Sequence, residues 1–153
     1  MTKASKTKNT EISDIAQLAA WLEEGCDDKQ DLVIGTENEK IVFNAKTLSP
    51  ARYEEISEFL TALQDYGWTP VYEGENLIGL ERDTANISLE PAGQVELSGA
   101  CFKDVHGTAG EVDQHISEIN EKSEQVGLNM IGLGLRLIAR HQLRLQMSRH
   151  RLI

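Results

Sequence analysis

The sequence predicts an α+β protein, an antiparallel β-sheet with flanking helices. Between residues 69 and 98, hydrophobic and polar residues alternate in four short segments, which is the period of β-strands. Segments on either side repeat apolar residues at steps of three and four, the period of helices. The links between the four predicted strands are too short for a parallel crossover, so neighbouring strands are expected to run antiparallel.

Composition narrows the function classes. The 153 residues, 40% hydrophobic and 26% charged, are typical of one globular domain. The net charge of −10 argues against nucleic acid as a partner, and the absence of any run of 18 apolar residues argues against a membrane-spanning helix. Cys26 and Cys101 have no metal-binding spacing and indicate a reducing, cytoplasmic location. The four histidines show no spacing typical of zinc.

Charge divides the chain into three parts. Residues 1–10 lack the apolar centre of a signal peptide and are predicted to form a disordered tail. A transit peptide is the alternative, although such peptides normally use arginine and run longer. Residues 11–135 form the predicted domain, and the first 135 residues together contain 10 basic and 25 acidic groups, a net charge of −15. Residues 136–153 contain five arginines and no acid. This divergent basic tail is either an amphipathic helix on a membrane or partner, or a poorly ordered end.

Apolar spacing and capping residues predict three helices. The first spans residues 10–25 with Thr10 as N-cap, and the second follows Ser49 as N-cap, with Pro50 at its first position and Gly67 at its end. The third spans residues 104–127. Its predicted packing face contains Val105, Ala109, Val112, Ile116, Ile119 and Val126, and its predicted solvent face contains Glu111, Asp113, Glu118, Glu121, Lys122 and Glu124.

Six strands are predicted, at residues 32–43, 69–73, 77–82, 86–90, 94–98 and 128–135. In the first, Glu37 and Glu39 share a face and lie about 7 Å apart. Two acids between apolar neighbours are either solvated, or they are paired, protonated or bound to a cation.

A second acidic group follows in the last two strands of the meander. The tight link at residues 91–93 is expected to bring Glu90, Gln94 and Glu96 together on one sheet face. A water-facing side of an antiparallel sheet is the simpler explanation for these residues alone. With Glu37 and Glu39, however, the set reaches four carboxylates and one amide. Such oxygen ligands suit Mg²⁺, which commonly also binds substrate phosphates.

Three motifs carry a resemblance to a known family. Residues 34–40 (IGTENEK), 89–99 (LEPAGQVELSG) and 128–134 (LNMIGLG) resemble, in the same order, the plant and proteobacterial type of glutamate–cysteine ligase, and the resemblance covers residues 11–135. Three positions depart from the family pattern: Asn38 stands where histidine is expected, Ala92 where a second glycine is usual, and Cys101 where proline is usual.

The resemblance implies that residues 11–135 are the N-terminal part of a glutamine-synthetase-like catalytic domain. The family joins the γ-carboxyl of L-glutamate to the amine of L-cysteine through γ-glutamyl phosphate, with ATP as co-substrate and Mg²⁺ as cofactor, in the first step of glutathione biosynthesis. It implies that Glu37, Glu39, Glu90 and Glu96 are Mg²⁺ ligands and that Glu37, Glu90 and Gln94 contact substrate or ATP. No protein nucleophile is implied, because the substrate carboxylate attacks.

Length leaves alternatives open. Family members are roughly three times as long as this chain, and their catalytic domain exceeds one ordinary domain. The expectation is therefore a ligase in truncated form. The alternatives are a non-catalytic remnant or partner-binding fragment of such a ligase, and a related carboxylate–amine ligase with a different amine. Assembly into a homo-oligomer is also left open.

Overall fold

The computed structural model describes residues 12–26 and 32–133. The chain forms two compact units, residues 1–32 and 33–153. The first contains α1 (Ile15–Glu23), whose N-cap Asp14 accepts a hydrogen bond from the Gln17 N–H at 2.9 Å. The helix is therefore shorter than the predicted range 10–25, and Asp14 rather than Thr10 is its cap. Every described side chain of this unit is exposed.

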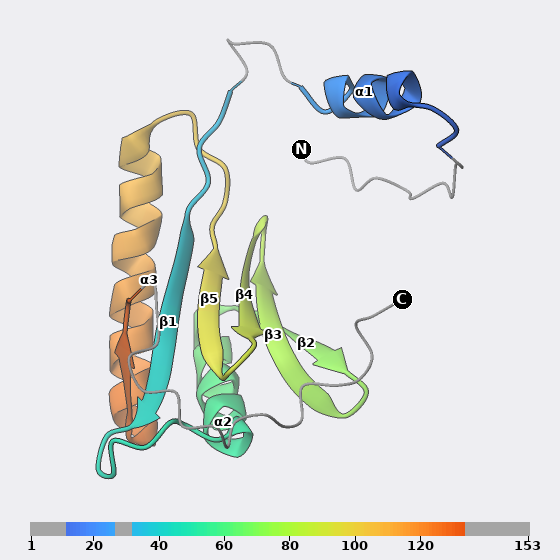
Figure 1. Ribbon diagram of the computed structural model, residues 1–153. Helices are drawn as coiled ribbons and strands as arrows, with labels where there is room; N and C mark the ends of the chain where they lie inside the picture. Colours follow the sequence, from blue (N-terminus) through green and yellow to red (C-terminus); the bar gives the residue numbers. More distant parts are fainter. Residues whose placement is uncertain (1–11, 27–31, 134–153) are drawn as a thin grey trace. The chain divides into compact units, whose positions relative to one another are not determined.

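The second unit is built on a six-stranded antiparallel sheet (Figure 1). Its order is β2 (Thr69–Glu73), β3 (Asn76–Arg82), β4 (Ala85–Glu90), β5 (Gln94–Ser98), β1 (Glu37–Asn44) and β6 (Leu128–Ile131). The predicted α+β class is confirmed, as are the antiparallel meander from β2 to β5 and the pairing of the first strand with it. β1 starts at Glu37 instead of residue 32, and upstream of it Ile34 forms an isolated bridge with Phe102.

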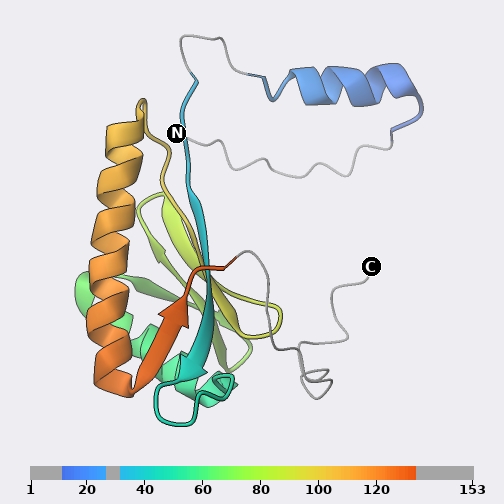
Figure 2. The ribbon, with the colours of Figure 1, turned by 60° about the vertical axis from the view of Figure 1, so that its left-hand side comes forward.

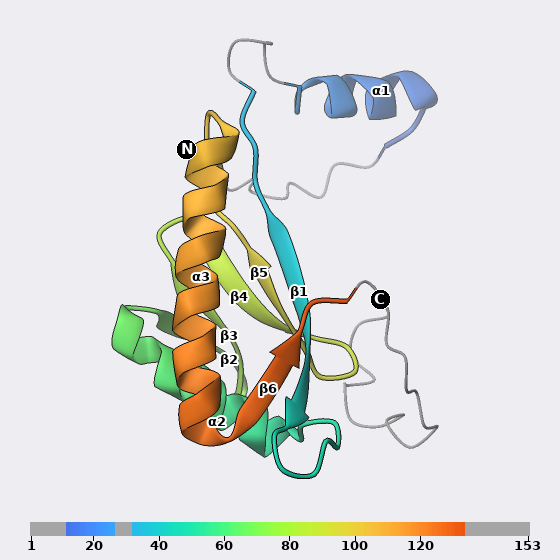
Figure 3. The same cartoon turned by 90° about the vertical axis from the view of Figure 1, so that its left-hand side faces the viewer.

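Two helices pack against the same face of the sheet (Figure 2). They are α2 (Tyr53–Leu63), which continues into the short 3₁₀ helix η1 (Gln64–Tyr66), and α3 (Val105–Val126). Figure 3 looks onto this face, with α3 in front of the strands. The core between the layers includes Ile56, Phe59, Leu60 and Leu63 of α2, Ile119 of α3, and Val42, Leu80, Ile87, Val95 and Leu97 of the sheet.

The start of α2 corrects the sequence-based prediction. Pro50 pairs with Phe43 in an isolated bridge, and the Ala51 N–H donates to the Val42 carbonyl, so this segment is extended instead of helical. The helix begins at Tyr53, and Arg52 takes the N-cap position predicted for Ser49. Gly67 ends the helical segment in the left-handed region at φ 83°, as predicted.

The buried face of α3 also differs from the prediction. Val105 and Ile116 are exposed by 62% and 39%, whereas Glu118 and Lys122 are buried. The two charged residues are buried because each has an oppositely charged partner: Arg82 for Glu118, and Asp65 for Lys122. The strand that follows, β6, is shorter than the predicted 128–135 and alternates at its start between buried Leu128 and exposed Asn129. Within the described residues, no helix is long and apolar enough to cross a membrane.

Candidate functional site

The sheet face that α2 and α3 leave uncovered contains all five candidate residues. Val42, Ile87, Val95 and Leu97 point into the core, so strand alternation places Glu37, Glu39, Glu90, Gln94 and Glu96 on the opposite side. Asn86, Ser88 and Ser98 share this side. We call these eight residues the acidic face. The structure thus brings together the two acidic groups that lie more than 50 positions apart in the sequence.

Cross-strand register arranges the acidic face in three rows across β4, β5 and β1. One row contains Asn86, Ser98 and Glu37, the next Ser88, Glu96 and Glu39, and the third Glu90, Gln94 and Ile41. Directly opposite residues in an antiparallel pair have Cβ atoms about 5 Å apart, and like charges at that spacing repel. Glu39 and Glu96 form such a pair, and Glu96 occupies the central position among the acids.

The electrostatics of Glu96 reflect that position. Burial raises the pKa of the Glu96 carboxyl, and the nearby carboxylates of Glu90, Glu37 and Glu39 raise it further. The hydroxyl of Ser98, which donates to Glu96 Oε1 at 3.4 Å, opposes this rise. Lys40, the one cation on β1, points to the helix side, where it is buried and its Nζ bonds to Asn38. No basic residue therefore neutralises the acidic face within its three rows.

The acids do not form a closed metal cage. Among the described residues, no group of three or more histidine, cysteine, aspartate or glutamate side chains is arranged to hold a metal ion. Glu37 and Glu39 are exposed, and Glu90 and Glu96 are half-buried. The four carboxylates therefore lie separately on the sheet face that α2 and α3 leave uncovered.

A different polar cluster lies between α3 and the sheet, and Glu118 is its centre. Its carboxylate accepts hydrogen bonds from Arg82 Nη1 at 2.8 Å, Trp68 Nε1 at 3.0 Å and Gln114 Nε2 at 2.7 Å. Burial alone would raise the pKa of Glu118, but these donors outweigh it and hold the pKa below its usual value. The guanidinium of Arg82 also lies over the Trp68 ring, 4.1 Å from its centroid.

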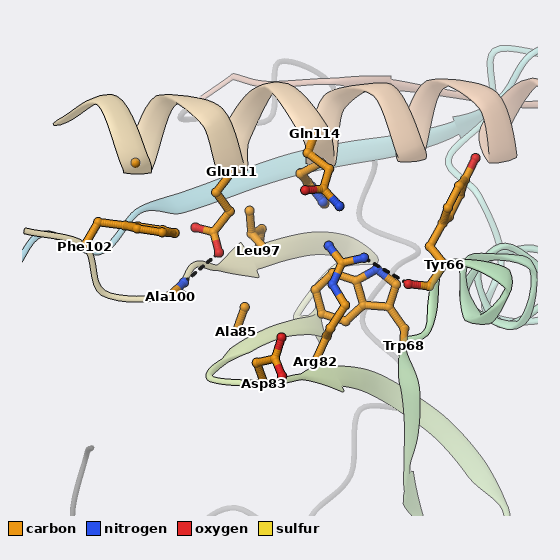
Figure 4. Close-up of a pocket in the computed structure, with 12 residues that line it drawn as sticks. Tyr66, Trp68, Arg82, Asp83, Ala85, Leu97, Ala100, Phe102, Glu111 and Gln114 are labelled. Carbon is orange, nitrogen blue, oxygen red and sulfur yellow. Dashed lines mark hydrogen bonds between the residues drawn. The ribbon is translucent and has the colours of Figure 1, made fainter. Parts of the chain in front are cut away.

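This cluster borders a pocket of 610 Å³ between the N-terminal half of α3 and the β3–β4 hairpin (Figure 4). On one wall Glu111 accepts a hydrogen bond from the Ala100 N–H at 2.8 Å. His115, also in the lining, is 2% exposed, and its Nδ1 makes no hydrogen bond with a described residue. Burial, together with the charges of Lys40 and Arg82, lowers the pKa of His115 to about 4, although Glu118 opposes this effect. The imidazole is therefore neutral at pH 7.

Comparisons with known proteins identify the chain's relatives. A model of the glutamate–cysteine ligase family 2 (GCS2) matches residues 33–151, most of the chain. The chain belongs to the glutamate–cysteine ligase family. It is 42% identical over 118 residues to the chloroplastic glutamate–cysteine ligase of Nicotiana tabacum, and 41% identical over 118 residues to those of Brassica juncea and Arabidopsis thaliana.

The relatives define how much of the ligase this chain represents. Each match covers 76% of this chain but 23% of the relative, so the chain spans about a quarter of the length of the curated ligases that it matches. The family match reaches residue 151, and thus extends through most of the basic tail, which lies outside the described residues. The family match over residues 33–151 contains all five candidate residues of the acidic face.

Sequence reasoning missed the cluster around Glu118. Glu118 and Lys122 were predicted to be solvated, as was Glu111, which is half-buried. One signal was available: Arg82 has the same strand parity as the core residue Leu80, so it points to the helices and requires an acidic partner there.

Proposed function

We propose that the acidic face is the Mg²⁺- and nucleotide-binding surface of a glutamate–cysteine ligase. The reaction is the ATP-dependent joining of the γ-carboxyl of L-glutamate to the amine of L-cysteine through γ-glutamyl phosphate. One observation carries the proposal: three adjacent strands present four carboxylates and an amide on the one sheet face that α2 and α3 leave uncovered, in a chain of this family.

The residues present fit Mg²⁺. This ion takes oxygen ligands, keeps several waters and is usually held by one or two carboxylates together with substrate phosphates. An open face with separate acids suits that mode of binding, and no closed cage is needed. A cation would also relieve the repulsion around Glu96, which burial and the acids on β4 and β1 produce. Glu37, Glu39, Glu90 and Glu96 are the proposed ligands.

The side chains then have distinct tasks. When bound, Mg²⁺ would supply charge neutralisation for the phosphate oxygens of the nucleotide. Glu37 and Glu90 lie at opposite corners of the acidic face and are proposed to contact substrate or ATP as well. Gln94, opposite both Glu90 and Ile41, adds an amide that can donate as well as accept a hydrogen bond. The attacking group is the substrate carboxylate, so a protein nucleophile is not required.

Because the chain spans about a quarter of its curated relatives, ligation by this chain alone is the part of the proposal that needs the most direct test. A non-catalytic remnant or partner-binding fragment would keep the fold without binding ATP. A related ligase would bind ATP but use another amine. The cytoplasmic location is likewise a proposal, and the three relatives compared above have names that describe them as chloroplastic. Assembly as a homo-oligomer is an open part of the same proposal.

Thermal melting with Mg²⁺-ATP and glutamate tests the binding site. A ligand at 100 times its Kd stabilises a folded protein by about 2.7 kcal/mol, so the wild-type chain should melt at a clearly higher temperature. The double variant Glu37→Gln/Glu96→Gln should lose this shift. A matched control, Glu58→Gln/Glu75→Gln, changes two exposed acids outside the acidic face and should keep it.

Each outcome has a distinct meaning. A shift that the acidic-face variant retains in full would place ATP elsewhere and overturn the proposed site. A cooperative melt without any shift in the wild type would favour the remnant. Where binding is found, phosphate release with L-cysteine, compared with other amines, identifies the amine substrate.

A further inference from the structure

The pocket between α3 and the β3–β4 hairpin lies on the helix side of the sheet, apart from the acidic face. Its volume of 610 Å³ falls within the range of small-molecule sites, about 300–1,000 Å³. Two glycines shape its wall: a methyl group on Gly107 would lie 2.6 Å from Phe102 Cδ1, and one on Gly99 would collide with the Glu111 carboxylate. The positions of both lining side chains therefore depend on a neighbouring residue that has no side chain.

Two side chains on the α3 wall have a buried polar atom without a partner. They are Glu111 and His115, and neither Glu111 Oε2 nor His115 Nδ1 makes a hydrogen bond with a described residue. The residues are four positions apart on α3, so they project from the same face of the helix, and both line the pocket. His115 is 2% exposed, and a buried polar atom without a partner destabilises a fold. Two such atoms on one pocket wall indicate a ligand that forms hydrogen bonds with them.

The charges of the lining favour a cation as that ligand. Arg82 is the only lysine or arginine among the described lining residues, and its Nη1 already donates to Glu118 Oε1 at 2.8 Å and to the Tyr66 carbonyl at 3.1 Å. Neither Glu111 nor Asp83, the two lining acids, forms an ion pair with a described residue. The pocket therefore has two carboxylates without a counter-charge.

The arrangement of these groups suits a ligand with a donor at each end. Figure 4 shows Glu111 reaching from α3 beside the Phe102 ring, with Asp83 on the hairpin below. Aromatic faces attract organic cations within about 6 Å. Since burial and the charges of Lys40 and Arg82 keep the pKa of His115 at about 4, its neutral ring offers one nitrogen as a hydrogen-bond acceptor at pH 7.

We propose that this pocket binds a small organic diamine in its doubly protonated form. One ammonium group donates hydrogen bonds to the Glu111 carboxylate and to His115 Nδ1, and the other pairs with Asp83. The methylene chain between them lies against Phe102 and Leu97 of the lining. This site does not depend on the proposed function, because the acidic face lies on the other side of the sheet.

Calorimetric titration of the full chain with 1,4-diaminobutane tests the site. The wild type should bind this diamine, whereas butane-1,4-diol, an uncharged molecule of the same length, should not bind. Glu111→Gln should bind the diamine roughly tenfold more weakly, because a hydrogen bond between two charged groups is lost. Asp83→Asn should weaken binding less, since Asp83 is exposed and water screens its charge. Asparagine also tolerates the left-handed backbone of this position, at φ 54°.

The matched control is Glu124→Gln, which removes an exposed acid from the same helix and should bind like wild type. The acidic-face variant Glu37→Gln/Glu96→Gln should also keep its affinity for the diamine. Melting without ligand shows whether each variant folds, and Asp83→Asn and the diol keep the test decisive if Glu111→Gln does not.

Three results would overturn the diamine site: no binding by the wild type, equal binding of the diol, or wild-type affinity in a folded Glu111→Gln variant. Loss of binding in the acidic-face variant alone would assign the diamine to that surface and would overturn the site as well. None of these results affects the proposed ligase function, which is tested with Mg²⁺-ATP.

Discussion

The two faces of the sheet differ in how their charged side chains are paired. On the helix side, buried Glu118 and Lys122 each have an oppositely charged partner, and Glu118 accepts three hydrogen bonds. On the acidic face, four carboxylates lie on three neighbouring strands, and none of its three rows contains a basic residue. Charges buried in a fold need a partner within it, whereas like charges on an exposed surface are either solvated or neutralised by a cation, as proposed for Mg²⁺. The difference separates structural ionic groups from candidate functional ones.

The largest effect is expected from breaking the helix side at Glu118. Glu118→Ala leaves half-buried Arg82 without its carboxylate partner and removes the acceptor for Trp68 and Gln114. Loss of one partner of a buried ion pair destabilises a protein by about 3–5 kcal/mol. Urea denaturation should show a loss of that size. Glu124→Ala, at an exposed position on the same helix, should cost less than about 0.5 kcal/mol. Similar losses in the two variants would refute the structural role of Glu118.

His115 should make the stability of the helix side depend on pH. Its pKa is about 4 in the folded protein against an ordinary value of 6.5, so the unfolded chain takes up the proton more readily. The contribution of neutral His115 to the free energy of unfolding is fully present above pH 6.5. The free energy of unfolding should fall by roughly 3 kcal/mol as the pH drops to 4. In His115→Leu this slope should be largely absent from denaturation midpoints measured over that range. His106→Leu, at an exposed position, should keep it, and an unchanged slope in His115→Leu would assign the pH dependence to other groups.

The acidic face was more accessible to prediction than the helix side because it depends on local rules. Strand period two fixes which of Glu37, Glu39, Glu90 and Glu96 share a face, and the short link after Glu90 fixes the neighbouring strand. The helix side depends on long-range partners: Arg82 lies 36 residues from Glu118, and Asp65 lies 57 residues from Lys122. Helical periodicity assigns such residues to solvent because it contains no information about a distant counter-charge.

The predicted starts of the first strand and of the second helix were wrong for a related reason. Residues 32–36 have the composition of a strand, but β5 ends at Ser98, opposite Glu37, so the continuous ladder stops there and only the isolated bridge between Ile34 and Phe102 follows upstream. Pro50 has the position of a helix start, but its neighbour Ala51 bonds to Val42 on β1. In both places pairing with another strand determined the boundary, and local propensity did not.

The smallest effect, and the sharpest test of the comparison, is expected on the acidic face itself. Burial and the surrounding carboxylates raise the pKa of Glu96 in the folded protein. The charged form of Glu96 therefore destabilises the folded state once the pH rises above the ordinary pKa of a glutamate. Glu96→Gln should therefore be slightly more stable than wild type at pH 7, with a free energy of unfolding that is higher by about 0.5 kcal/mol or less. Thermal melting of the two proteins measures this difference. The gain should vanish in acid, where the wild-type carboxyl is also neutral. Saturating Mg²⁺-ATP should reverse the order, because it would stabilise wild type but not the variant. A variant that is less stable than wild type without ligand would mean that Glu96 supports the fold, and the contrast between the two faces would be lost.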